Sequence, residues 1–129
     1  MDHSAALDQY RQVGVQTGVV DASPHKMIEM LFNGVTEKLA YAKGAIQRKD
    51  LAQQGEHISK AIRIIDTLRA SLDHKQGGEI AANLASLYDY MERRLTRANM
   101  EADAKVIDEI SALIEQISTA WDSIPAELR

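Results

Sequence analysis

The distribution of proline places the strongest limit on how this chain can fold. The sequence contains two prolines, Pro24 and Pro125, so residues 25–124 contain none. Proline interrupts helix interiors, and the aromatic residues that favour strands make up only 5% of the chain. Gly77-Gly78 is the single adjacent glycine pair, so few positions favour a break. The long proline-free span predicts an all-α domain.

Apolar residues recur every three or four positions in four segments, as they do on the buried face of a helix. We predict helices over about residues 24–49, 51–72, 79–97 and 103–123. Ser23 and Asp50 suit N-cap positions, Gln53 would complete a capping box after Asp50, and Asn99 would end the third helix. The predicted core residues are Met27, Leu31, Val35, Leu39, Ala42 and Ile46 in the first helix, Leu51, Ile58, Ile62, Ile65 and Leu72 in the second, Ile80, Leu84, Leu87, Met91 and Leu95 in the third, and Val106, Ile110, Leu113, Ile117 and Ile124 in the fourth.

Four amphipathic helices with short connections favour an antiparallel up-down-up-down four-helix bundle. We expect the bundle to occupy residues 23–125, after a mobile N-terminal arm at residues 1–22 and before a short tail at residues 126–129. A chain of 129 residues can bury a sizeable core without staples, and it has no cysteine to form disulfides. No run is apolar enough for membrane insertion, and no secretory signal opens the chain, so we expect a cytoplasmic protein.

The composition also argues against several classes of function. The formal net charge of −4 disfavours nucleic acid as a partner, because phosphate binding needs a concentrated basic surface. Di-metal bundles need Glu-x-x-His motifs, yet none of the nine glutamates has a histidine three residues later. Neither a phosphate-binding glycine loop nor a nucleophile elbow occurs. We therefore expect no metal, haem or other cofactor, and no enzymatic activity.

One short motif keeps an alternative open. Residues 57–61 (HISKA) resemble a histidine phosphotransfer motif, in which an exposed helical histidine accepts a phosphoryl group and a lysine three residues later neutralises it. Short charged pentads of this kind are common on helices, so we interpret His57 as a solvated side chain on the polar face of the second helix. A phosphotransfer module centred on His57 and a generic helical adaptor with another client are the alternatives.

A few apolar side chains lie away from the predicted core faces. On the first helix, Met30 and Tyr41 form a second shallow stripe with Gly34 and Ala45. Tyrosine and methionine at such positions suit contact with a partner's apolar segment. Tyr10 in the arm could cover this surface when no partner is bound. The candidate partner-binding residues are Tyr10, Met30, Leu31, Tyr41, Ile64, Tyr88 and Tyr90.

Several of these positions fall in motifs that resemble the FliS family of flagellin export chaperones. The motifs are residues 23–34 (SPHKMIEMLFNG), 72–73 (LD), 77–84 (GGEIAANL), 87–91 (LYDYM), 94–95 (RL), 98–99 (AN) and 120–121 (AW), which occur in the family's order. The resemblance covers residues 10–121. Phe32-Asn33-Gly34 differs from the Tyr-Asp-Gly usual in the family.

The resemblance implies a cytoplasmic, non-enzymatic chaperone that needs no cofactor. Such a protein binds the disordered C-terminal segment of newly made flagellin, prevents its premature polymerisation and presents it to a component of the flagellar type III export gate. An amphipathic client segment of this kind can wrap a helical bundle and fill shallow grooves. The sequence leaves open which flagellin is the client and whether the free chaperone forms a weak homodimer.

Overall fold

The computed structural model describes residues 23–128. This part of the chain forms four helices, α2 (Pro24–Arg48), α3 (Leu51–Ala70), α4 (His74–Glu101) and α5 (Ala104–Asp122), followed by the short 3-10 helix η1 (Ala126–Leu128). The predicted all-α bundle is therefore confirmed. The predicted mobile arm at residues 1–22, which includes Tyr10, lies outside the described residues.

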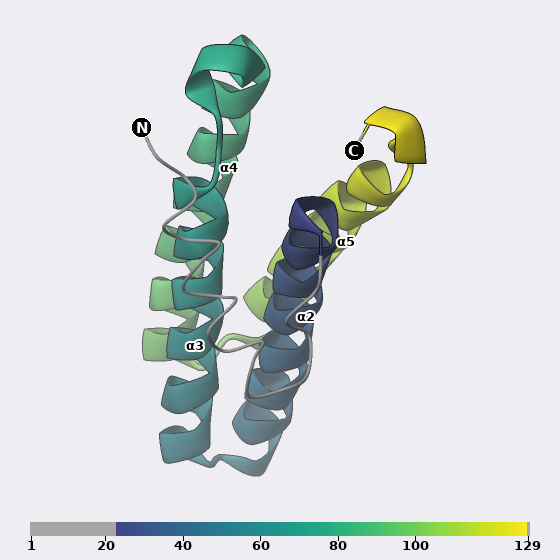
Figure 1. The fold of residues 1–129 in the computed structure, drawn as a ribbon. Helices are drawn as coiled ribbons and strands as arrows, with labels where there is room; N and C mark the ends of the chain where they lie inside the picture. The colour runs from purple at the N-terminus through teal and green to yellow at the C-terminus, as the bar shows by residue number, and fades with distance from the viewer. Residues whose placement is uncertain (1–22, 129) are drawn as a thin grey trace.

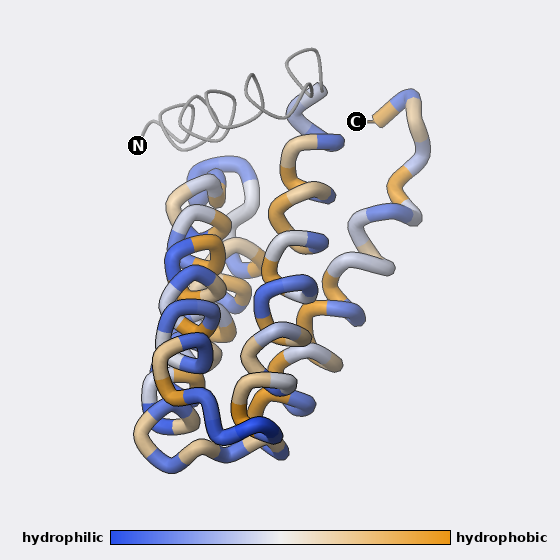
Figure 2. Tube along the Cα trace, turned by 90° about the horizontal axis from the view of Figure 1, so that it is seen from below, coloured by the Kyte–Doolittle hydropathy of each residue, from blue (hydrophilic) through white to orange (hydrophobic). Residues whose placement is uncertain are grey.

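The four helices enclose one core. Contacts join α2 to α3 and α5, and α4 to α3 and α5, so each helix has two neighbours around the bundle. Figure 1 shows α3 and α4 on one side and α2 and α5 on the other, with the C-terminal half of α5 leaning away from α4. Apolar segments of the chain turn toward the space between the helices, and hydrophilic segments turn outward (Figure 2). None of the described helices is long and apolar enough to cross a membrane.

Local side chains define where the helices begin. The Ser23 side chain accepts a hydrogen bond from the Lys26 backbone N–H at 3.1 Å, and Pro24 occupies the first turn of α2. Asp50 caps α3 by accepting from the Gln53 backbone N–H at 3.1 Å. In a complete capping box the Gln53 side chain would bond back to the Asp50 backbone N–H. Here Gln53 Oε1 instead lies 3.1 Å from His57 Nε2.

The start and end of α4 differ from the prediction. Asp73 caps a helix that already begins at His74, and the break falls at Gly78, whose φ of 50° and ψ of −124° are non-helical. Glycine adopts this conformation without a Cβ penalty, so one residue is enough to separate residues 74–77 from the rest of α4. The prediction that Asn99 ends the helix is wrong, because α4 continues to Glu101 and Ala102 supplies the left-handed cap.

The core contains most of the predicted positions, with three notable exceptions. Leu51 is 73% exposed and Ile80 is 72% exposed, so both assignments are wrong. Leu51 is the first residue of α3, and Ile80 lies near the start of α4, two residues after the break at Gly78. On α5 the predicted Val106 and Ile110 are buried, but Leu113 is only partly buried, whereas Ile114, one residue later, is fully buried.

Candidate functional site

An apolar cavity of about 470 Å³ opens at the end of the bundle where α2 and α4 begin and α3 and α5 end. This is the end at which α5 leans away from α4 in Figure 1. Apolar side chains of both α4 and α5 line the cavity at this end. Residues that line it include Ile28, Phe32, Ile80, Leu84, Tyr88 and Ile117.

One wall of the cavity is held by a contact between the two ends of the described chain. The His25 ring on α2 stacks on the Trp121 indole of α5, with ring centroids 4.7 Å apart and an interplanar angle of 8°. The Trp121 indole N–H also donates to the His25 backbone carbonyl at 2.9 Å. This pair connects the first turn of α2 to the last turn of α5, and both residues line the cavity.

Tyr88 contributes to the floor of the cavity rather than to an exposed surface. Its side chain is 2% exposed and belongs to the core, although the sequence named it among the candidate partner-binding residues. Burial raises the pKa of the Tyr88 phenol to about 12, since the phenolate is poorly solvated there. Leu31 is likewise 2% exposed within the core. Tyr88 lines the cavity, whereas Leu31 is buried in the core and is not among the residues that line it.

Tyr90 lies on another side of the bundle, where it connects α4 to α5. Its hydroxyl donates to Glu109 Oε2 at 2.6 Å, and Arg94 donates to the other oxygen of the same carboxylate at 2.9 Å. These two hydrogen bonds, the one from Tyr90 first, lower the pKa of Glu109, and the bond to Glu109 raises the pKa of Tyr90. The partly buried ring packs against the core, so Tyr90 supports the fold as well as offering one edge to solvent.

The remaining candidates gather along the seam between α2 and α3. A Cβ placed on Gly34 would lie 3.3 Å from Ile64 Cδ1, so the two helices approach closely there. Two turns further along α2, the Tyr41 ring lies 5.1 Å from the His57 ring and is 53% exposed. Met30 is partly exposed one turn before Gly34. We call Met30, Tyr41 and Ile64 the seam residues; Ala45, which the sequence placed with them, is instead fully buried.

His57 is not the solvated side chain that the sequence predicted. It is partly buried in the seam, where Nε2 lies 3.1 Å from Gln53 Oε1 and the ring contacts Tyr41. Nδ1 is buried without a hydrogen-bond partner among the described residues. A phosphoacceptor histidine needs a ring nitrogen free to meet the donor, whereas Nδ1 of His57 is buried and Nε2 is held by Gln53.

The sequence names the seam residues as candidates, which stays a prediction, and it does not indicate the cavity. The α4 positions that line the cavity, Ile80 and Leu84, were assigned to the core because they continue the stripe of Met91 and Leu95. The one signal that could reveal them is an apolar stripe on α4 that continues beyond the length of the helix that packs against it. Phe32, His25 and Trp121 carried no such signal, since their role depends on where α5 ends relative to α2.

Comparison with known proteins identifies close relatives over the whole described region. A family model described as Flagellar protein FliS matches residues 6–128. The flagellar secretion chaperone FliS of Salmonella typhimurium is 47% identical over 122 residues, which cover 94% of this chain and 90% of that protein. FliSB of Pseudomonas aeruginosa is 45% identical over 119 residues (92% and 94%), and FliS of Bacillus subtilis is 32% identical over 106 residues (82% and 78%).

Proposed function

The chain belongs to the FliS family, and from this membership we propose that it binds the C-terminal segment of flagellin in the cytoplasm, prevents premature polymerisation and delivers the subunit to the flagellar type III export apparatus. Its relatives are named flagellar secretion chaperones, so the protein is a chaperone of flagellar secretion and not an enzyme.

The apolar cavity is the observation that carries the proposal. Among the residues that line it, Ile80 is 72% exposed, whereas Phe32 and Tyr88 are buried. An apolar side chain of a client could therefore contact exposed Ile80 first and then pack against Phe32 and Tyr88. Burial of such surface is the main driving force for binding an amphipathic helix in a groove. A flagellin segment that is disordered before binding would offset its ordering cost by covering this surface.

The seam residues offer a second contact for the same client. Met30, Tyr41 and Ile64 lie along α2 and α3, on helices that also border the cavity. A segment long enough to occupy both surfaces would run along the bundle. The partly exposed edge of the Tyr90 ring lies on the α4–α5 side, where we propose that it contacts a separate part of the client.

The arm remains a prediction. Tyr10 lies outside the described residues, and we propose that it covers the client surface when flagellin is absent. Deletion of residues 1–12 should then tighten flagellin binding unless the arm also contacts the client. A component of the export gate is the second proposed partner, to which the loaded chaperone would pass its client.

A peptide titration tests the proposal directly. The full chain is titrated with a peptide of the flagellin C-terminal segment by calorimetry, with a peptide of the same composition in scrambled order as the control. We expect saturable one-to-one binding of the native peptide alone. Equal binding of both peptides would support a generic helical adaptor, and absence of binding would refute the proposed client.

The phosphotransfer alternative is tested separately. The protein is incubated with a phosphorylated response regulator, and transfer of label to the chain is measured for the wild type and for His57→Ala. We expect no transfer to either, because His57 is partly buried and its Nε2 is hydrogen-bonded. Label that reaches the wild type but not the variant would establish the alternative.

A further inference from the structure

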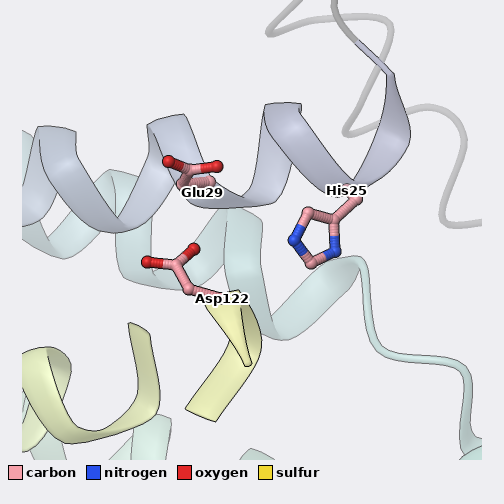
Figure 3. A group of neighbouring side chains, drawn as sticks. All are labelled: His25, Glu29 and Asp122. Carbon is pink, nitrogen blue, oxygen red and sulfur yellow. The ribbon is translucent and has the colours of Figure 1, made fainter. Parts of the chain in front are cut away.

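Three potential metal ligands converge beside the cavity, at the junction of α2 and α5. His25 and Glu29 lie one turn apart on α2, and Asp122 is the last residue of α5. One ligand atom from each of these residues lies within 4.8 Å of the other two. Figure 3 shows the two carboxylates on the same side of the His25 ring, with one ring nitrogen facing them.

The histidine supplies an independent sign that this group binds a ligand. His25 is 8% exposed, and its Nε2 is buried without a hydrogen-bond partner among the described residues. A buried polar atom without a partner costs free energy, so native structures usually satisfy it with protein, water or an ion. The stacking on Trp121 holds the ring in place, and therefore Nε2 remains directed at Glu29 and Asp122.

We propose that His25, Glu29 and Asp122 form a binding site for one zinc ion, with a fourth position open to water. Imidazole nitrogen with carboxylate oxygen is a ligand set typical of zinc, whereas magnesium and calcium prefer oxygen ligands alone. Two carboxylates neutralise the charge of a divalent cation. The carboxylates are partly or fully exposed, so they can move the short distance needed to reach a common ion, while the buried histidine provides the fixed ligand.

This group differs from the di-metal bundle sites that the sequence excluded. It uses one His-x-x-x-Glu pair on a single helix and one aspartate from the far end of the chain, so a search for Glu-x-x-His could not find it. The zinc ion would compete with Lys26, whose Nζ lies 3.3 Å from Glu29 on an exposed part of the surface. Bound zinc would join the first turn of α2 to the end of α5 and so stabilise one wall of the cavity. The proposal does not depend on the proposed chaperone role.

Calorimetric titration of the tag-free full chain with zinc chloride tests the site. We expect one zinc ion per chain, and at least tenfold weaker binding for Glu29→Gln and for Asp122→Asn. These two variants change a partly exposed and an exposed carboxylate and do not alter His25 or Trp121, so they should fold. Glu37→Gln on α2 and Glu115→Gln on α5 remove a similar charge elsewhere and should retain affinity within twofold. Magnesium chloride is titrated in parallel and should not bind.

Resonances of the histidine rings identify the ligand within the same samples. The chain has four histidines, His3, His25, His57 and His74, and zinc should shift the ring signals of His25 most strongly. The thermal midpoint should rise with zinc in the wild type and not in the two carboxylate variants. Absence of zinc binding, unchanged affinity in both variants, equal binding of magnesium, or shifts confined to the other histidines would each overturn the proposal.

Discussion

Replacement of Ile80 by alanine should weaken flagellin binding without destabilising the free protein. Ile80→Ala removes three carbons from a side chain that is 72% exposed at the cavity rim. At about 0.8 kcal/mol per buried methylene, and scaled by that exposed fraction, a client that covers the side chain completely would lose about 1.7 kcal/mol of binding free energy. This corresponds to a roughly fifteen- to twentyfold increase in Kd. The free energy of unfolding should change by less than about 0.5 kcal/mol, because the free side chain is mostly in water.

Leu51→Ala is the matched control for this experiment. Leu51 is 73% exposed, but it lies at the start of α3, at the opposite end of the bundle from the cavity. Fluorescence anisotropy of a labelled flagellin C-terminal peptide gives Kd, and thermal unfolding gives the midpoint for the same two variants. Ile80→Ala should change only Kd, and Leu51→Ala should change neither quantity. Equal losses of affinity in both variants, or no loss in Ile80→Ala, would show that the client does not cover the cavity rim.

Three further predictions concern stability and the roles of the tyrosines. Ile114→Ala should lower the free energy of unfolding by about 2 to 5 kcal/mol and Leu113→Ala by clearly less, as measured by urea denaturation, because only Ile114 is fully buried. Burial raises the pKa of the Tyr88 phenol to about 12. Its contribution to the free energy of unfolding should therefore be complete below about pH 10 and be lost as the pH rises through about 12. The loss, roughly 2 to 3 kcal/mol, should be absent in Tyr88→Phe. Tyr90→Phe should lower the thermal midpoint with little change in peptide affinity, because it removes only the hydrogen bond to Glu109, whereas Tyr90→Ala should lower both; a midpoint unchanged by Tyr90→Phe would contradict the connecting role of this residue.

Local sequence was sufficient to predict the number, type and approximate limits of the helices. Ser23 and Asp50 cap α2 and α3 through contacts within three residues, and such contacts can be read from neighbouring letters. Family motifs in the sequence were also sufficient to identify the FliS resemblance, which the comparisons confirm. The break at Gly78 was less predictable, because a glycine pair indicates where the helix can be interrupted but not how many residues leave the helical conformation.

Depth within the bundle was decided by the tertiary structure alone. Successive residues of a helix differ by about 100° around its axis, so a periodic pattern defines the inward face only to within about one residue. Ile114 rather than Leu113 is therefore fully buried. The same pattern says nothing of how far away the facing helix lies, so Ile80 and Met91 look alike in sequence although one is exposed and the other fully buried.

The cavity and the proposed zinc ligands depend on tertiary structure for the same reason. His25 and Trp121 stand at opposite ends of the described chain, and they meet because four helices of similar length return α5 to the start of α2. The tilt of α5 away from α4 then leaves apolar surface uncovered at that end. Helix formation is governed by contacts within a turn or two, whereas the site is created by the angle between helices, which depends on how all four buried faces pack at once.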